Sequence, residues 1–400
     1  MDWIFGGRSV QMLMLLLLLI WGVNATYAAH ILNVRKFGAV SGGKTDSSQA
    51  FLRAWEKACN LGGGFKILVP NGVFLVKPLV FQGPCKGFMA MQIKGILRAP
   101  KYLSYFHDDD WIKIEHIDGL FIGGGGVFDG QGAVAWPHNK CPKRKDCKLL
   151  PASFKLAHVT NATIQGITSL DSKSFHMIIF ESRNIRVDDV KIKAPETSPN
   201  TDGIHIEGSS NVNVTRSVIG TGDDCISVGP GNKKVSILDV FCGPGHGISV
   251  GSLGKYPGED DVFGLRVRNC TLAGTMNGVR VKTWQASPRS SASDFVFEDI
   301  VMRDVYNPII IDQKYCPYSS CDEKFPSMVK LSNIKFRNIR GTSTSKVAVK
   351  LLCSKAVPCE DVELRDINLK YIKKGVPALA SCSNVVHGSS KGLVIPPPCI

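Results

Sequence analysis

Short runs in which apolar and polar residues alternate occur along most of the chain. Runs that begin at Asn161 (NATIQGI), Asn184 (NIRVDDV), Asn211 (NVNVTRS) and Lys234 (KVSILDV) recur every 23 to 27 residues. Alternation with a period of two is typical of a β-strand with one buried face, and recurrence at a longer interval indicates stacked repeats. The pattern therefore predicts an all-β solenoid, a parallel β-helix in which each repeat is one coil.

Two other all-β architectures remain open on spacing alone. An up-and-down antiparallel barrel and a β-sandwich also consist of short strands at regular intervals. The β-helix is favoured by the polar residue at corresponding positions of three runs, Asn161, Asn184 and Asn211, because stacked coils can align side-chain amides in a ladder. Longer intervals beyond residue 250 place insertions between strands, as expected for a solenoid with loops on one side.

One segment near the start has the period of a helix. In SSQAFLRAWEKAC the apolar residues recur at helical spacing, and Ser47 or Ser48 is the candidate N-cap; these residues are Ala50, Phe51, Ala54, Trp55 and Ala58. A helix at this end would cover the open strand edge of a stacked β core. We therefore predict one domain, residues 30–400, with an N-terminal capping helix.

Residues 1–29 have the pattern of a secretory signal peptide. Arg8 precedes an apolar run from Met12 to Ile20, and small residues (ATYAA) follow. The run is shorter than the roughly 20 apolar residues that a membrane-spanning helix needs. We predict cleavage near Ala28 or Ala29, a secreted mature protein and no membrane anchor.

Secretion makes the thirteen cysteines candidates for disulfide bonds. No C-x-x-C pair occurs, which argues against a metal or redox role. The spacing suggests six pairs: Cys59/Cys85, Cys141/Cys147, Cys225/Cys242, Cys316/Cys321, Cys353/Cys359 and Cys382/Cys399. Cys270, in the middle of a strand-like run, is then the unpaired one, a small buried hydrophobe. In a secreted chain, the sequons at Asn161, Asn213 and Asn269 are candidates for glycosylation where the side chain faces water.

The formal net charge of +14 favours a polyanionic partner. Nucleic acid, anionic lipid and acidic polysaccharide all have this property, and export favours the polysaccharide. The densest basic run, Lys140 to Lys148, is predicted to be an exposed loop.

Acidic residues and a histidine recur at the length of one coil. Asp202 (NTDG) is followed after 21 residues by Asp223 and Asp224 (GDDC), and His246 (GHG) lies 22 residues beyond Asp224. Residues one coil apart lie about 4.8 Å from each other, so these side chains would meet. Hydrolysis of a glycosidic bond needs one protonated and one ionised carboxyl, and crowded carboxyls can hold both states at one pH. A turn role is the competing interpretation for any single Asp-Gly pair; the common spacing favours an active site.

Two basic residues stand beside this cluster in the sequence. On a strand, Arg280 and Lys282 of NGVRVKTW share one face, opposite Val279 and Val281. Two neighbouring cations on a solvent face would bind a sugar carboxylate. Metal motifs are absent from the sequence (no H-E-x-x-H, paired C-x-x-C or EF-hand loop), and GGGG at 123–126 lacks the Lys-Ser/Thr of a phosphate-binding loop. We therefore predict neither a metal site nor a cofactor.

The blocks NTDG, GDDC, GHGISVGSLG and RVK, in this order, resemble the signature blocks of polygalacturonases, the family 28 glycoside hydrolases. The likeness also includes FGA…TDSSQAF…AW…AC, GVFDGQGAVAW and the cysteine-rich end, so it spans nearly the whole mature chain. The resemblance implies a right-handed parallel β-helix of the pectin-lyase-like type. It also implies an enzyme that hydrolyses α-1,4-linked galacturonan (pectate) with inversion of configuration. The pattern is most similar to plant enzymes and favours the exo-acting type found in pollen.

The resemblance also implies roles for individual residues. Asp223 would be the general acid, Asp202 and Asp224 would together activate the attacking water, and His246 would tune the protonation of the cluster. Arg280 and Lys282 would bind galacturonate carboxylates. Asn200 would orient the water, and Tyr315 (IIIDQKYC) would contact substrate. The partner would be homogalacturonan of the plant cell wall, with no nucleic acid or membrane involved, and the protein would be a monomer.

Three competing functions and one local question stay open on the sequence alone. A pectate lyase has the same fold but needs calcium carboxylates and an arginine base, which the aspartate cluster does not favour. An endo-acting enzyme and a catalytically silent pectin-binding β-helix also fit the sequence. Adjacent residues on a strand point to opposite faces, so we suggest a bend or bulge at Gly222 to bring Asp223 and Asp224 to one site.

Overall fold

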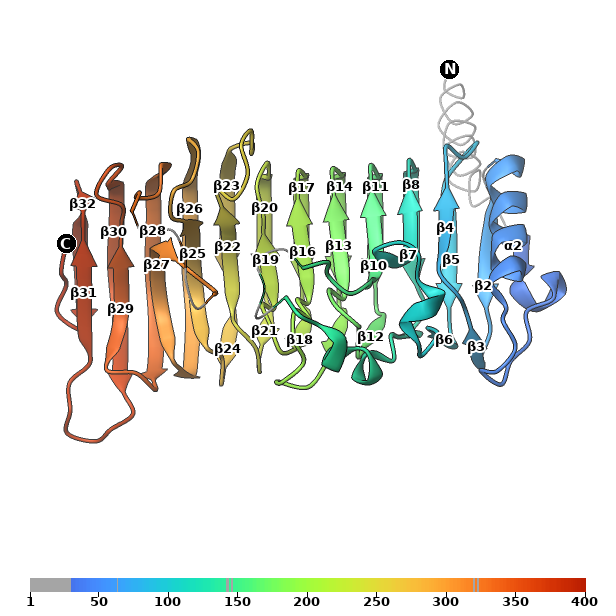
Figure 1. Ribbon diagram of the computed structural model, residues 1–400, viewed down its shortest axis with the longest axis horizontal. Helices are drawn as coiled ribbons and strands as arrows, with labels where there is room; N and C mark the ends of the chain where they lie inside the picture. The colour runs from blue at the N-terminus through green and yellow to red at the C-terminus, as the bar shows by residue number, and fades with distance from the viewer. Residues whose placement is uncertain (1–29, 63, 142–143, 145–146, 319–320, 322–323) are drawn as a thin grey trace, which may run out of the picture.

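The computed structural model describes residues 30–400 except 63, 142–143, 145–146, 319–320 and 322–323. The strands stack into one elongated solenoid, with helix α2 (Ser48–Leu61) at one end and the C-terminus at the other (Figure 1). The predicted signal peptide, residues 1–29, lies outside the described residues. Within the described part of the chain, no helix combines the length and apolar character required to span a bilayer.

The strands form three rows along the solenoid, and every neighbouring pair is parallel. The first row holds β1 (His30–Asn33), β2 (Phe65–Val69), β5 (Met89–Ile93), β8 (Asp118–Gly123), β11 (Thr160–Gln165), β14 (Arg183–Asp188), β17 (Ser210–Thr215), β20 (Lys233–Leu238) and β23 (Val262–Arg268). The second row holds β3 (Val73–Leu75), β6 (Ile96–Arg98), β9 (Val127–Asp129), β12 (Thr168–Leu170), β15 (Lys191–Lys193), β18 (Val218–Gly220), β21 (Phe241–Cys242) and β24 (Thr271–Ala273).

Toward the C-terminus these two rows merge into long bent strands. These are β26 (Ser290–Val305), β28 (Val329–Ser343) and β30 (Cys359–Tyr371), followed by β32 (Val385–Val386) and β33 (Ser389–Ile395). The third row holds β4 (Leu79–Gln82), β7 (Asp110–Glu115), β10 (Ala152–Ala157), β13 (Met177–Phe180), β16 (Ile204–Glu207), β19 (Ile226–Val228), β22 (Ile248–Leu253), β25 (Asn277–Trp284), β27 (Asn307–Tyr315), β29 (Val347–Leu352) and β31 (Leu379–Ser383). The site described below lies on the third row and in the turns that lead into its strands.

The core is a column of stacked aliphatic side chains inside the three rows. Ile164, Val187, Val214 and Ile237 are partners in consecutive strands of the first row, and none of them is exposed. Their polar neighbours in sequence point outward, which explains the alternation in the sequence. Burial of these columns at every coil is the main stabilising term of the fold.

The asparagine ladder is present where the sequence predicts it. Asn184 Nδ2 donates to Asn161 Oδ1 and Asn211 Nδ2 donates to Asn184 Oδ1, both at 3.0 Å. All three residues have positive φ values of 55° to 58°, which asparagine tolerates better than most residues. The sequon at Asn213 lies on an outward, exposed position of β17, whereas the amide nitrogens of Asn161 and Asn269 donate to aspartates.

Helix α2 (Ser48–Leu61) covers the first coil, as predicted, and buries Phe51 and Trp55 against the stack. Trp55 Nε1 also donates to the carbonyl of Gln82 at 3.0 Å. Ser47 is the N-cap residue, but its hydroxyl makes no capping bond. Instead, the Asp46 carboxylate accepts the Ser48 backbone N–H at 3.0 Å.

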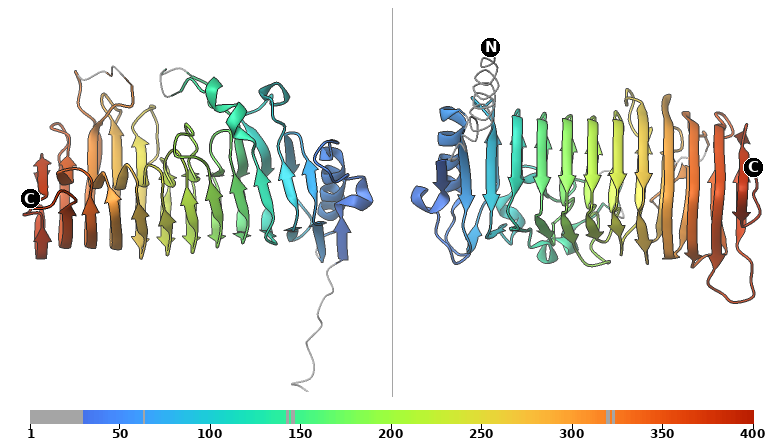
Figure 2. Two further views of the ribbon diagram at one scale, coloured as in Figure 1. Left: turned by 90° about the horizontal axis from the view of Figure 1, so that it is seen from below. Right: turned by 180° about the vertical axis from the view of Figure 1, so that it is seen from behind.

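The six predicted disulfide bonds are all present. Cys270 is unpaired and buried, as expected. Cys59–Cys85 ties the capping helix to the stack, and Cys382–Cys399 ties the proline-rich tail to the last coil. Loops project from one side of the solenoid (Figure 2) and include the short 3₁₀ helices η2 (Leu103–Tyr105), η3 (Gly132–Val134) and η4 (Trp136–His138). A further 3₁₀ helix, η1 (Val34–Phe37), precedes α2.

Candidate active site

Asp223 and Asp224 lie in a turn between β18 and β19, before the strand begins. The alternation rule of strands does not apply there, so both carboxyls can reach one site without a β-bulge. Gly222 makes the turn possible because a Cβ at this position would lie 2.0 Å from the carbonyl oxygen of Ser198. The sequence correctly indicates Gly222 as the special position, but the reason is close packing against the previous coil.

Replacing Gly222 by alanine is expected to lower kcat/KM by about 10²-fold, because displacing reacting groups by about 1 Å has a cost of that size. Gly166→Ala is the matched control, since Gly166 has open space around its Cβ position and only a positive φ of 60°. Both variants would be assayed for hydrolysis and for thermal unfolding. Equal activity in the two variants would contradict a positioning role for Gly222.

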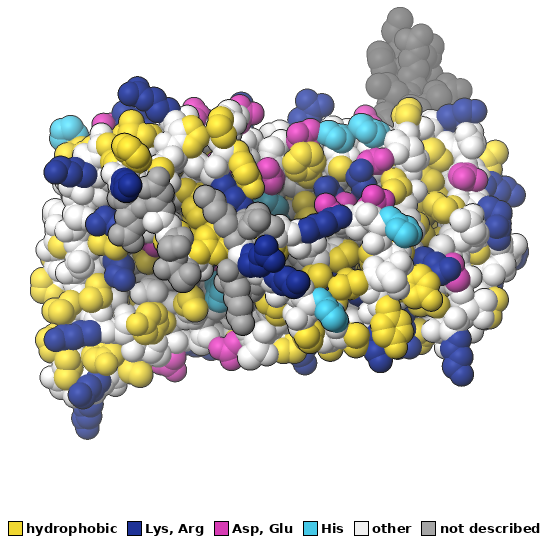
Figure 3. Space-filling view, in the orientation of Figure 1, with side chains coloured by type: hydrophobic (Ala, Val, Ile, Leu, Met, Phe, Trp, Pro, Cys, Tyr) yellow, Lys and Arg dark blue, Asp and Glu magenta, His cyan; other side chains and the backbone are white. Residues whose placement is uncertain are grey.

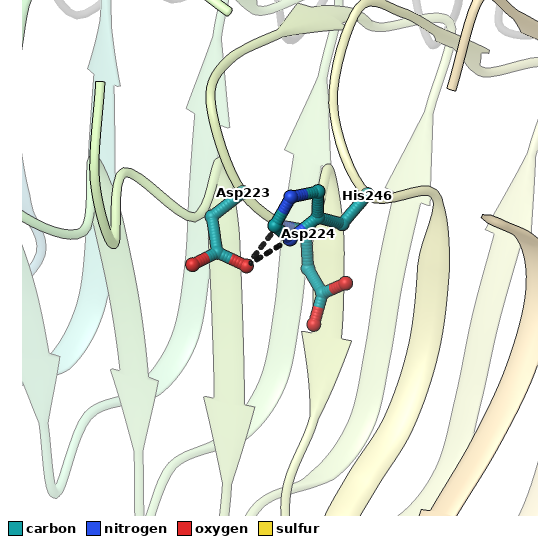
Figure 4. Close-up of side chains that lie close together, drawn as sticks. All are labelled: Asp223, Asp224 and His246. Atoms are coloured by element: carbon teal, nitrogen blue, oxygen red, sulfur yellow. Dashed lines mark hydrogen bonds and ion pairs between the residues drawn. The ribbon is translucent and has the colours of Figure 1, made fainter. Parts of the chain in front are cut away.

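The Asp223 carboxyl faces the groove described below, and both of its oxygens make hydrogen bonds. Its Oδ1 lies 2.9 Å from His246 Nδ1 and accepts the Asp224 backbone N–H at 2.8 Å (Figure 4). Its Oδ2 accepts Asn200 Nδ2 at 3.3 Å. The side chain is 18% exposed, so Asp223 combines fixed orientation with access to a bound ligand.

Asn200 is itself oriented by Asn139, which no motif in the sequence indicated. Asn139 Nδ2 donates to Asn200 Oδ1 at 3.0 Å, and its Oδ1 accepts the Cys141 backbone N–H at 2.9 Å. The disulfide loop that starts at Cys141 is therefore linked to Asp223 through two asparagines.

Asp224 is buried in an ion-pair cluster beneath Asp223. Its Oδ1 accepts Arg280 Nη2 at 2.7 Å, and its Oδ2 accepts Lys282 Nζ at 2.8 Å. Burial alone would raise the pKa of Asp224, but Lys282 and Arg280 together lower it below the usual value. Asp224 is therefore the carboxyl that stays ionised.

Arg280 and Lys282 do share one face of β25, as predicted, while Val279 and Val281 point into the core. The two cations are on the outer face and line the groove described below, as predicted, but they are not free in solvent. Their side chains are only 10% and 9% exposed. Both cations pair with Asp224, which reaches them from the turn and offsets one of their two positive charges.

Asp202 is buried on the other side of the cluster, and Ser227 Oγ donates to its Oδ2 at 2.8 Å. Burial raises the pKa of Asp202 well above its ordinary value, and the nearby charges of Asp223 and Asp224 raise it further. The site thus contains a carboxyl that stays ionised and another that readily takes a proton, which is the combination that acid/base hydrolysis requires.

Two serines connect these carboxyls to the strands. Ser249 Oγ donates to Asp224 Oδ1 at 2.8 Å, as Ser227 does to Asp202. Ser227 and Ser249 are partners in β19 and β22, and Ser249 is the partner of Arg280 in β25. Ser227 lies three residues after Asp224, and Ser249 lies three residues after His246. The one-coil spacing of the cluster therefore also predicts that the two serines are neighbours.

The cluster opens into a groove of about 1190 Å³. Tyr315, which the resemblance implies as a substrate contact, lines the groove. Lys282 Nζ lies 5.3 Å from the centroid of the Tyr315 ring, and the Trp284 ring packs edge-on against the Tyr315 ring. Lys148 and Lys255 also line the groove, and on the face shown in Figure 3 basic side chains gather near the middle of the stack. Four carboxyls, Asp109, Asp202, Asp223 and Asp224, line the same groove. Because Arg280 and Lys282 share the single charge of Asp224, this part of the groove keeps positive charge for an anionic ligand.

Asp223, Asp224 and His246 each offer one ligand-type atom within 4.8 Å of the others, a spacing that would suit a cation. Both oxygens of Asp224 already accept from Arg280 and Lys282. The positive charge that this carboxylate needs is thus supplied by side chains.

The comparisons with known proteins agree with this geometry. Residues 59–391 match the profile of Glycosyl hydrolases family 28. An exopolygalacturonase from Platanus acerifolia is 48% identical over 359 residues, which cover 90% of this chain and 95% of that protein. An exopolygalacturonase from Oenothera organensis is 50% identical over 355 residues, which cover 88% of this chain and 98% of that protein.

A solved structure supports the fold independently of close sequence identity. The polygalacturonase from Erwinia carotovora ssp. carotovora superposes with a TM-score of 0.73 at 22% identity, covering 91% of this chain and 96% of that one. The architecture is that of the right-handed parallel β-helix. With the profile match over most of its length and relatives near 50% identity, this chain belongs to glycosyl hydrolases family 28.

Proposed function

We propose that this family 28 glycosyl hydrolase cleaves α-1,4-D-galacturonosyl linkages in homogalacturonan by an inverting acid/base mechanism. The observation that carries the proposal is the pair of oppositely tuned buried carboxyls, Asp202 and Asp224, beside the accessible Asp223. The basic side chains beside the carboxyl cluster and the relatives named exopolygalacturonase support an acidic polysaccharide as the partner.

In this proposal Asp223 protonates the leaving oxygen, because it is the most exposed of the three carboxyls and is held in a fixed orientation. Asp202 and Asp224 activate a water on the other side of the bond, and Asn200 helps to position this water. An inverting enzyme needs carboxyls about 6.5–9.5 Å apart to make room for it. The three carboxyls share the catalytic proton as one coupled cluster. Asp223 can therefore act as the acid when Asp202 is ionised and the shared proton is on Asp223.

His246, in contact with Asp223, tunes this proton distribution. Arg280 and Lys282 keep Asp224 ionised and present the remaining part of their charge to the galacturonate carboxylates. Tyr315 packs over Lys282 and contacts the sugar. Lys255 extends this positive surface along the groove, whereas Lys148 is paired with Asp109 there.

We further propose that the protein acts outside the cell, in the plant cell wall, as a monomer, after removal of residues 1–29. Six disulfide bonds are typical of a protein that folds in an oxidising compartment. Exo action is favoured by the names of the two relatives described above. The competing hypotheses are endo action and a catalytically silent pectin-binding protein, and the following experiment separates them.

The test is chromatography of the products that the mature protein releases from polygalacturonic acid in the presence of a calcium chelator. Galacturonic acid alone from the earliest time is the expected result and indicates exo-hydrolysis. Mixed saturated oligomers would indicate an endo enzyme. No product, or unsaturated products only after calcium is restored, would overturn the hydrolase proposal.

A further inference from the structure

His205 lies in the wall of the groove and links a surface carboxylate to the site. Its Nε2 lies 3.2 Å from Glu207 Oε2, and its Nδ1 lies 2.8 Å from Ser227 Oγ. Ser227 Oγ in turn donates to Asp202 Oδ2 at 2.8 Å. A continuous chain of hydrogen bonds therefore runs from Glu207, on the same strand as His205, to Asp202 inside the carboxyl cluster.

The number of protons in this chain depends on the charge of the imidazole. A hydroxyl has one proton to donate, so when Ser227 donates to Asp202 it must accept a hydrogen bond from a protonated His205 Nδ1. The contact with the Glu207 carboxylate requires a proton on Nε2 as well. Only the imidazolium carries both. In neutral His205 with the proton on Nε2, Nδ1 is an acceptor and competes with Asp202 for the single Ser227 proton.

The next coils contain the same arrangement with a permanent charge. Arg280 Nε donates to Ser249 Oγ at 2.9 Å, and Ser249 Oγ donates to Asp224 Oδ1 at 2.8 Å. His205 is the strand partner of Ser227, as Arg280 is of Ser249. Because an arginine is always protonated, Ser249 always donates to Asp224. The corresponding position at Asp202 holds a histidine, the side chain whose charge changes near neutral pH.

We propose that Glu207, His205 and Ser227 are positioning residues that form a protonation relay to Asp202. While His205 is charged, the Ser227 hydroxyl donates to Asp202 and favours its ionised form, which shifts the cluster proton toward Asp223. When His205 loses its proton, the hydroxyl turns to Nδ1 and Asp202 takes the proton. This inference deepens the proposed function, on which it rests, by naming the group that ends activity on the alkaline side.

The other charged groups near His205 are consistent with an imidazolium. Glu207 is its direct partner, and the hydrogen bond from His205 is the main cause that lowers the pKa of Glu207. Asp202 faces it across Ser227, and Asp223 and Asp224 lie beyond. Lys155, on β10, acts on Glu207 from the opposite side. The Phe175 ring packs against the imidazole at 5.2 Å and adds no charge.

The sign of the pH dependence follows from this arrangement. Activity is present while His205 is charged and falls as rising pH removes its proton. Removing the negative charge of Glu207 makes the imidazolium easier to deprotonate. The alkaline limb of the kcat/KM profile is therefore expected to move to lower pH in Glu207→Gln, by about one pH unit.

Glu181→Gln is the matched control. Glu181 follows the strand next to that of Glu207, and its carboxylate faces His158 at 3.1 Å. This variant removes the same charge one coil away without touching His205, so its alkaline limb should stay in place. Equal displacement in the two variants would attribute the effect to general electrostatics and overturn the relay.

Ser227→Ala tests the connection itself. Without the hydroxyl, Glu207→Gln should no longer move the alkaline limb, whereas Ser227→Thr, which keeps a hydroxyl, should restore its response. Thermal unfolding of each variant establishes that it is folded. A displacement as large in the double variant Ser227→Ala/Glu207→Gln as in Glu207→Gln alone would overturn the proposal.

A measurement without substrate separates this inference from the proposed function. In protein with labelled histidine and aspartate, NMR titration should show the His205 imidazole losing its proton as the Asp202 carboxyl gains one. Failure to release products from polygalacturonic acid would overturn the proposed function but leave this titration intact. A neutral His205 throughout the active pH range would overturn the relay alone.

Discussion

Replacing Asp223 by asparagine is expected to lower the rate of galacturonan hydrolysis by about 10²–10⁴-fold, the usual contribution of general acid/base catalysis. Asparagine keeps the shape of the side chain but cannot protonate the leaving oxygen. Its amide oxygen can still accept the Asp224 backbone N–H and face His246, so the fold and the binding of oligogalacturonide should largely survive. Initial rates and oligosaccharide affinity, measured on the same preparation, separate the two effects.

Asp361→Asn is the matched control for this substitution. Asp361 is exposed, lies on β30 several coils beyond Asp223 and has a positive φ of 53°, which asparagine also tolerates. Its activity should equal that of the unaltered protein. Unchanged hydrolysis in Asp223→Asn would show that the assignment of the acid is wrong.

Replacing Asp224 by asparagine is expected to destabilise the protein by about 3–5 kcal/mol, because removing one partner of a buried ion pair leaves the other charge uncompensated. Here two cations, Arg280 and Lys282, lose their common partner in a site that water reaches poorly. The free energy of unfolding, measured by denaturant titration at neutral pH, gives the size of the effect.

Asp188→Asn provides the comparison. Asp188 is as buried as Asp224, but its partners Arg186 and Arg216 are each 54% exposed and can turn to water. Its loss of stability should be clearly smaller. A loss as large as that of Asp224→Asn would indicate that burial of the cations is not the cause.

The contribution of Asp224 also depends on pH. Its pKa is lower in the folded protein than in the unfolded chain, where an aspartate titrates near about 3.9. The contribution is therefore fully present above that value and is lost as the pH falls toward the lower folded pKa. The difference in unfolding free energy between the unaltered protein and Asp224→Asn should be constant from about pH 5 upward and shrink in stronger acid. A difference that grows with acidity would contradict the depressed pKa.

The features that repeat along the chain were the ones that the sequence predicted well. Because the coils stack, residues separated by one coil length in the sequence become neighbours in space. The ladder from Asn161 to Asn211 and the proximity of Asp202 to Asp224 therefore follow from the spacing alone. The capping helix follows from its own local period. The disulfides were suggested by proximity in sequence, together with the compartment implied by residues 1–29.

Features that depend on a single turn or on a contact between distant residues were not predictable in this way. The burial of Arg280 and Lys282 results from the course of the backbone at Asp224, which strand alternation does not describe. The linkage from Asn139 to Asp223 crosses from a loop to a turn, outside the repeat. Glu207 and His205 form an ordinary-looking pair in a strand, and only the position of Ser227 in the next coil connects them to the site.

The unequal lengths of the coils have a consequence for how such an enzyme can change. Ser227 follows His205 by 22 residues, whereas Arg280 follows Ser249 by 31, yet both pairs are strand partners. Register between strands, not distance along the chain, sets the position of each reacting group. Insertions and deletions in the intervening loops can therefore reshape the ends of the groove without moving the catalytic side chains relative to one another. Substrate preference and catalytic competence can evolve as separate traits in this architecture.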